Sequence, residues 1–276
     1  MPQTKKRPWE LKVLTALRIL LLIGFCSFGL VASLRLYRTW TTNKTNAELR
    51  DLKAFFVDSG EQVDWSDGML DINEDYVGWL TVPGTNIDGP VVQGEDNDEY
   101  LRTDFYGEHS IAGTLFMDEM VDVSDSKANR IIYGHMMYDS TMFGDLKHFK
   151  TRSFFEKHEF VVWEDRFGLS CYRLFAAVIV SGSATNTEYL NIQQWAGALD
   201  KEQTSEMLTI LSERAFLYRD DMFRGENQYI FLVTCDGQQN AWRDNKLILV
   251  GERISADEDE IQEWVEQNDS SEEQVS

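Results

Sequence analysis

The chain has 276 residues, of which 43% are hydrophobic, and its formal net charge at pH 7 is −21. A chain of this length and composition can bury a complete hydrophobic core. The acidic balance argues against nucleic-acid binding, because phosphate contacts require clustered Lys and Arg side chains, and the body of the sequence has no such cluster. We therefore exclude nucleic acid as a partner.

A long uncharged stretch near the N-terminus follows five basic residues, which are Lys5, Lys6, Arg7, Lys12 and Arg18. The uncharged residues 19–34, together with residues 13–17, are long enough to cross a bilayer, which takes about 20 residues, so we place the membrane anchor at residues 13–36. The basic excess before the stretch favours a cytoplasmic segment at residues 1–12 and an extracellular remainder, although Arg35 and Arg38 follow it. A cleaved signal peptide is the alternative, with Val31-Ala32-Ser33 as a poor cleavage site. We expect a retained single-pass membrane anchor.

After the anchor, the sequence predicts a mainly β protein. Residues 43–57 carry apolar side chains at helical spacing, so we expect residues 37–76 to form an N-terminal helical arm. Helical patterns recur after His135, at residues 190–195 and at residues 201–216. Eight short apolar runs indicate strands at residues 77–82, 87–93, 114–117, 129–133, 159–163, 169–180, 228–234 and 246–253.

Turn residues separate these strands. Pro83 and Gly84 stand where a type II turn requires them, and residues 165–168 are typical of a hairpin turn. We therefore expect an eight-stranded β-barrel with helical additions at residues 77–254.

Residues 255–276 contain nine Asp and Glu residues and no Lys or Arg. This composition predicts that residues 255–276 form an acidic, disordered tail.

The three cysteines differ in their surroundings. An odd number argues against a disulfide framework, so a thiol outside the cell is either buried and inert or used in chemistry. Cys26 lies in the apolar stretch, and Cys171 lies inside a predicted strand as an inert small hydrophobe. Cys235 ends a strand that we expect to be buried on both faces, and turn residues follow it. Cys235 is therefore the candidate nucleophile.

A second strand ends in the same way. Residues 130–133 form a short apolar run that Gly134 ends, and His135 follows at once. We expect the two strand ends to lie side by side and to form a Cys235/His135 pair, because a thiol attacks carbonyls as thiolate and His exchanges protons near neutral pH. The other histidines, in polar or helical surroundings, are expected at the surface; they are His109, His148 and His158.

No metal site or cofactor is predicted. Zinc requires several Cys or His residues at short spacing, and the sequence has no such pair. Acyl chemistry at a thiol also needs donors for the developing oxyanion. Arg243, Lys246 and the backbone after Cys235 are the candidates.

Several stretches at consistent spacing resemble the motifs of class B sortases. Residues 232–235 (Leu-Val-Thr-Cys) are similar to the family's Thr-Leu-x-Thr-Cys signature, with Phe231 where Thr is usual. The resemblance covers residues 77–254 and is carried by residues 77–94, 100–101, 113–118, 132–135 (Ile-Tyr-Gly-His) and 139–143. The helical insert at residues 190–216 is also similar to class B.

This resemblance implies a membrane-anchored transpeptidase of Gram-positive bacteria. Such an enzyme cleaves a Thr-containing sorting signal in an exported surface protein, forms a thioester on cysteine, and transfers the acyl group to an amine of a cell-wall peptide or a pilin lysine. Cys235 would be the nucleophile and His135 the general acid. A cysteine endopeptidase with water as acceptor and a catalytically weak surface binding module remain alternatives.

The sequence departs from the family pattern at the arginine. The family's arginine stands immediately before the last strand, where this chain has Lys246, and the nearest arginine is Arg243. The chemistry favours Arg243, because a guanidinium presents five donors in a fixed fork. We therefore predict the catalytic set Cys235, His135 and Arg243.

Overall fold

The computed structural model describes residues 8–58, 65–220, 228–235, 245–255 and 260–261. Its contacts divide the chain into two units, Met1–Thr45 and Asn46–Ser276. The first unit holds most of helix α1 (Pro8–Asp58), which includes the apolar segment Thr15–Leu34. This segment has 20 residues and a mean hydropathy of 2.2, and none of it is buried by protein. It is therefore long and apolar enough to cross a bilayer.

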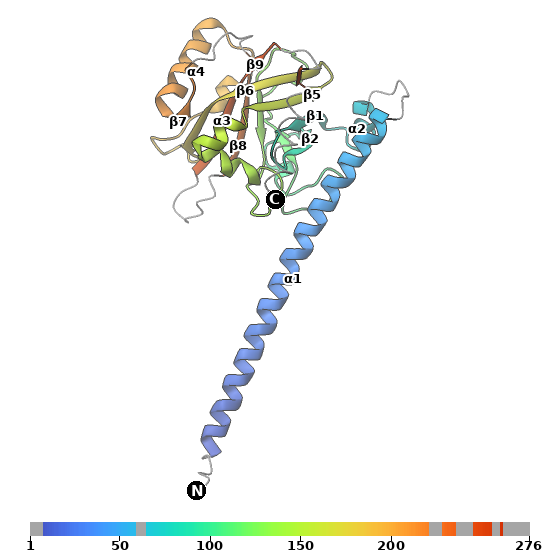
Figure 1. The fold of residues 1–276 in the computed structure, drawn as a ribbon, viewed down its shortest axis with the longest axis vertical. Coiled ribbons are helices and arrows are strands. Elements are labelled where there is room, and N and C mark those ends of the chain that lie inside the picture. Colours follow the sequence, from blue (N-terminus) through green and yellow to red (C-terminus); the bar gives the residue numbers. More distant parts are fainter. Residues whose placement is uncertain (1–7, 59–64, 221–227, 236–244, 256–259, 262–276) are drawn as a thin grey trace. The chain divides into compact units, whose positions relative to one another are not determined.

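The second unit is built on a closed barrel (Figure 1). The barrel strands follow one another in the order β5-β1-β2-β3-β4-β8-β9-β6, and β5 also pairs with β6, which closes the ring. The expected eight-stranded barrel is therefore confirmed. Its strands are β1 (Tyr76–Thr81), β2 (Asp88–Val92), β3 (Leu115–Met117), β4 (Arg130–Tyr133), β5 (Phe160–Asp165), β6 (Gly168–Ser181), β8 (Tyr229–Cys235) and β9 (Asn245–Ile254).

A ninth strand, β7 (Ala215–Tyr218), lies outside the ring. β6 is 14 residues long, and β9 pairs along one of its edges. The other edge pairs first with β5 and then with β7, where Leu217 lies opposite Ala177. The prediction of a helix at residues 201–216 is therefore wrong at the C-terminal boundary. Helix α4 (Lys201–Arg214) stops two residues earlier, because β6 offers its unpaired backbone groups to the following residues.

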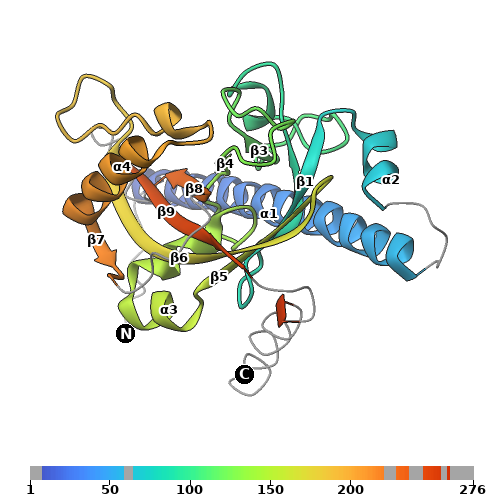
Figure 2. The ribbon, with the colours of Figure 1, turned by 90° about the horizontal axis from the view of Figure 1, so that it is seen from above.

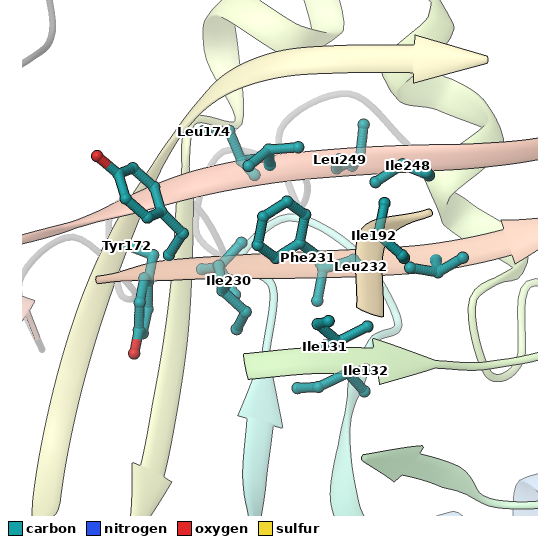
Figure 3. Packing of buried hydrophobic residues seen from close by; sticks show 14 of the residues in the cluster. Ile131, Ile132, Tyr172, Leu174, Ile192, Ile230, Phe231, Leu232, Ile248 and Leu249 are labelled. Carbon is teal, nitrogen blue, oxygen red and sulfur yellow. The ribbon is translucent and has the colours of Figure 1, made fainter. Parts of the chain in front are cut away.

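The core fills both faces of β8, the strand that ends at Cys235. Phe231 and Leu232 are adjacent in sequence and are both 0% exposed, as a strand buried on both faces requires. Figure 3 shows their side chains among those of the flanking strands β4 and β9. The 3-10 helix η3 (Ile192–Trp195) adds Trp195, whose ring stacks on Phe231 at 5.8 Å between centroids. β8 is thus held rigidly where the chain approaches Cys235.

Two predicted turns are confirmed. Gly84 has a φ of +74°, the left-handed conformation that the third position of a type II turn requires. Asp165 pairs with Gly168 at the β5–β6 hairpin, where Gly168 has a φ of +100°. The chain after His135 is helical as expected, with η2 (Gly144–Lys150) and α3 (Arg152–Lys157).

The helical arm contributes a second apolar cluster. The expected helix at residues 43–57 lies within α1, and Leu49 is buried there together with Met69 of α2 (Trp65–Ile72). Trp79 of β1 and Tyr100 of the 3-10 helix η1 (Glu99–Leu101) complete the contact. This part of the arm therefore packs against α2, β1 and η1.

Three residues of the acidic C-terminal segment are described. Ser255 is exposed, whereas Glu260 and Ile261 are helical and Ile261 is 1% exposed. Ile261 packs in a small cluster with Val162 and Cys171. We expected this segment to be solvated, but Ile261 covers part of the barrel wall. Figure 2 shows this wall, in which β6 and β9 are neighbours.

Glu252 of β9 makes stability depend on pH. It is 2% exposed, lies opposite Tyr229 and hydrogen bonds with that residue, and burial raises its pKa to about 7 from an ordinary value of 4.5. Between these two pKa values, the folded chain holds a proton that the unfolded chain has released. Stability therefore falls as pH rises through this window. We expect Glu252→Gln to raise the melting temperature, relative to the parent chain, more at about pH 8 than at about pH 5.

Thermal unfolding at both pH values tests this expectation. Glu213→Gln on the exposed side of α4 is the control, because that carboxylate stays in water and its removal should shift the melting temperature equally at both pH values. If Glu252→Gln also shifted the melting temperature equally at the two pH values, Glu252 would not be protonated in the folded chain.

Candidate active site

The site lies where strands β4 and β8 end. These strands run parallel, with Ile132 opposite Leu232 and Tyr133 opposite Val233. The ladder continues one residue further, because the backbone N–H of Gly134 donates to the carbonyl of Val233 at 3.2 Å. His135 follows Gly134 directly, and Cys235 follows Val233 by two residues. The expectation that the two strand ends lie side by side is therefore confirmed at the level of the backbone.

Cys235 is the last residue of β8, and the antiparallel register of β8 and β9 places it opposite Lys246. Lys246 is half-buried. Arg243 lies outside the described residues. The structure therefore brings three of the four sequence candidates to one end of the barrel: His135 follows the end of β4, Cys235 ends β8, and Lys246 lies at the start of β9.

The imidazole of His135 is held by a backbone carbonyl. Its Nε2 lies 2.9 Å from the carbonyl oxygen of Leu101, the last residue of η1. A carbonyl oxygen only accepts hydrogen bonds, so Nε2 carries the hydrogen in this contact. Nδ1 is then the nitrogen that can take up a proton, as a partner of a thiol must.

The pKa of His135 is lowered, chiefly because burial disfavours the charged imidazolium. The positive charges of Arg102 and Lys246 lower it further, whereas the hydrogen bond to Leu101 opposes them. A neutral imidazole at neutral pH can accept the proton of a thiol. Lys246 lies opposite Cys235 in the β8–β9 register, on the strand next to the one that carries the thiol.

The segment after His135 forms a tight loop. The backbone N–H of Phe143 donates to the carbonyl of His135 at 3.0 Å, and Asp139 accepts hydrogen bonds from the backbone and hydroxyl of Thr141. Ser140 and Met142 have φ values of +64° and +49°, which are costly for residues other than glycine. The loop is thus fixed on both sides of its tip.

The other histidines lie elsewhere, and the expectation for one of them is wrong. His109 is exposed, and the side chain of His148 is 50% exposed with Asp145 at 3.7 Å. His158 is only 3% exposed, although we expected it at the surface. Its ring stacks on Phe154 at 4.1 Å between centroids, and it fills the space where Gly84 lacks a Cβ. The spacing of four residues between Phe154 and His158 was a signal for this contact.

Cys171 fits its predicted structural role. It is 1% exposed, and burial raises the pKa of its thiol to about 12. A thiol with such a pKa stays protonated at neutral pH and is a poor nucleophile. Among the parts of the chain that the structure describes, no three His, Cys, Asp or Glu side chains are arranged to hold a metal ion.

Comparison with known proteins decides the family. A model of the sortase domain matches residues 80–254, which is more than half of the chain. The chain belongs to the sortase family. Members of this family are cysteine transpeptidases, and the strand ends that carry Cys235 and His135 both lie within the match.

The relatives are class B sortases. The chain is 33% identical to sortase B of Staphylococcus aureus over 139 residues, which cover 50% of this chain and 57% of that protein. It is 28% identical to sortase B of Listeria monocytogenes over 198 residues, which cover 71% and 77% of the two chains. These matches identify the resemblance seen in the motifs as one to class B.

Solved structures agree with this fold. The structure of Clostridium perfringens sortase B is 30% identical with a TM-score of 0.60, and the match covers 68% of this chain and 99% of that one. A Staphylococcus aureus sortase B–substrate complex superposes with a TM-score of 0.68 over 80% and 100% of the two chains at 22% identity, so it supports the fold alone. The sortase barrel is therefore the scaffold of the candidate site.

Proposed function

We propose that this sortase is a membrane-anchored cysteine transpeptidase. It cleaves a Thr-containing sorting signal of an exported surface protein or pilin and transfers the acyl group to an amine. The supporting observation is the parallel register of β4 and β8, which brings the residue after Gly134 to the end of the strand that carries Cys235. A Cys/His arrangement at a strand end matches the requirement of nucleophilic acyl transfer.

The proposed reaction has two steps, in which His135 moves one proton. The thiol of Cys235 transfers its proton to His135, the sulfur bonds to the carbonyl carbon of the signal, and the carbon–nitrogen bond breaks. The imidazolium gives its proton to the leaving amine. In the second step the nitrogen of the acceptor amine bonds to the thioester carbon, the carbon–sulfur bond breaks, and the proton that the amine loses goes to the sulfur, which restores the thiol. A water acceptor would instead make the protein an endopeptidase.

The proposed location follows from the N-terminal segment. Sortases are membrane-associated, and Thr15–Leu34 is long and apolar enough to cross a bilayer. The basic residues before it favour a single pass with the catalytic barrel outside the cell. The amine of a cell-wall precursor or of a pilin lysine is then accessible to the site. We propose boundaries at residues 13–36 for the anchor and 37–76 for the arm.

Mass spectrometry of the intact protein tests this function. After incubation with a library of sorting-signal peptides, we expect a mass increase on Cys235 equal to the acyl fragment, and an amide product when an amine is added. Hydrolysed peptide without any amide product would instead support an endopeptidase. The absence of any acyl adduct on a folded protein with a reactive thiol would support a binding module.

A further prediction separates the two candidate cations. We propose Arg243 as the oxyanion donor, because its guanidinium can bind a carbonyl and a developing oxyanion together. Arg243→Ala should lower turnover by about 10²-fold, in line with loss of one oxyanion donor, whereas Lys246→Ala should lower it little. Steady-state kinetics with one peptide substrate measure both variants, and the reverse ranking would assign the role to Lys246.

Lys246→Ala has its own expected signature. A positive charge near an imidazole lowers its pKa, so removing the charge of Lys246 should raise the pKa of His135. The pH dependence of turnover should then shift toward higher pH. An unchanged profile would show that the charge of Lys246 does not act on His135.

A further inference from the structure

The carbonyl that holds His135 belongs to a residue 34 positions earlier in the chain. Leu101 ends the short helix η1, and its backbone N–H donates to the carbonyl of Asp98 at 3.2 Å. The position of a backbone carbonyl is set by the conformation of the main chain around it. The orientation of His135 therefore depends on the groups that fix the backbone of η1.

Gly113 is the first of these groups. It has a φ of +62°, and a Cβ built on it would collide with the carbonyl oxygen of Tyr100 and lie 2.9 Å from that of Leu101. The next residue, Thr114, donates its backbone N–H to the Tyr100 carbonyl at 3.1 Å. The chain entering β3 therefore lies directly against the backbone of η1, and glycine leaves the space for it.

Tyr100 is the second group. Its side chain is 5% exposed, and its hydroxyl donates to the carboxylate of Asp75 at 2.7 Å. The amide of Asn73 donates to the same hydroxyl at 3.2 Å. Burial raises the pKa of Tyr100 to about 12, so the hydroxyl keeps the proton that it donates. Tyr100 is thus fixed through its side chain at one end and through its carbonyl at the other.

We propose that Gly113 and Tyr100 are positioning residues for His135. They fix the Leu101 carbonyl, and that carbonyl holds the imidazole in one orientation and in its Nε2–H tautomer. The effect on turnover rests on the proposed function of His135. The hydrogen bond itself is independent of turnover, so it can be measured without a substrate.

The first variant is Gly113→Ala, with Gly107→Ala as its matched control. Gly107 has a φ of +81° and nothing within 4 Å of a built Cβ, so its substitution also places an alanine at a positive φ but does not touch η1. In Gly113→Ala, nitrogen-15 NMR should show loss of the Nε2–H signal of His135. The pKa of His135 should fall, because the variant loses the hydrogen bond to Leu101 that raises it and keeps the positive charges of Arg102 and Lys246 that lower it.

Turnover gives the second readout. Misplacement of a catalytic group by about 1 Å costs up to about 10²-fold in rate. We therefore expect kcat of Gly113→Ala to fall by about 10²-fold with KM changed little, and Gly107→Ala to match the parent chain. A folded Gly113→Ala protein with the parental His135 pKa and tautomer would overturn the proposal.

Tyr100→Phe is the second variant, for the case that Gly113→Ala does not fold. It removes only the hydroxyl, and Tyr229→Phe is its control, because Tyr229 hydrogen bonds to Glu252 at the start of β8, the end of that strand remote from Cys235. We expect Tyr100→Phe to lower the His135 pKa by a smaller amount and Tyr229→Phe to leave it unchanged. Equal effects of the two variants would remove Tyr100 from the proposal.

The two proposals fail in different ways. If the parent chain forms no acyl adduct but Gly113→Ala still changes the His135 signals, the proposed function is wrong and the positioning role stands. If the parent chain is active and the His135 signals do not respond to Gly113→Ala, the positioning role is wrong and the function stands.

Discussion

Cys235→Ala should abolish both peptide cleavage and transfer while the protein stays folded. Alanine has no sulfur, so no thioester can form, and it can keep the backbone pairing of β8 with Lys246 of β9. Intact mass spectrometry after incubation with peptide should therefore show no acyl adduct, and the melting temperature should stay close to that of the parent chain. An acyl adduct on this variant would show that another residue is the nucleophile.

Cys171→Ala is the matched control for this prediction. The thiol of Cys171 is buried against Val162 and Ile261, so its loss removes packing and no chemistry. We expect turnover close to that of the parent chain and a lower melting temperature, as for other losses of buried volume. Loss of activity at an unchanged melting temperature would contradict the structural role of Cys171.

His135→Ala should suppress formation of the acyl-enzyme by about 10²–10⁴-fold, the usual contribution of general acid–base catalysis. The variant loses the group that takes the proton of the thiol and returns it to the leaving amine. The measurement is the single-turnover rate of acylation with a fixed peptide. Unfolding is a small risk, because His135 lies in the loop after β4 and is half-buried.

His109→Ala is the control for His135→Ala, because His109 is exposed. Its acylation rate should match that of the parent chain. His158→Ala is a different case, since its buried ring packs on Phe154, and we expect a loss of stability there. If folded His109→Ala were as slow as His135→Ala, the Cys235/His135 assignment would be wrong.

The sequence alone determined the barrel strands, the apolar N-terminal segment and the candidates Cys235 and His135. These features are local. A strand buried on both faces appears as a continuous apolar run, and turn residues such as Gly134 mark where it ends. Candidate catalytic residues that come directly after such runs can therefore be recognised without a structure. The same holds for the glycine of the type II turn, Gly84.

Only the tertiary structure decided which groups surround the imidazole. The Leu101 carbonyl lies 34 residues from His135, and the β4–β8 register joins residues about 100 positions apart, as between Ile131 and Phe231. Barrel closure sets these contacts, and no local periodicity encodes them. The burial of His158 and the end of α4 at β7 have the same cause. In each case a distant segment overrides the local preference of the chain: the backbone at Gly84 leaves space for the ring of His158, and β6 supplies the hydrogen-bonding partners of β7.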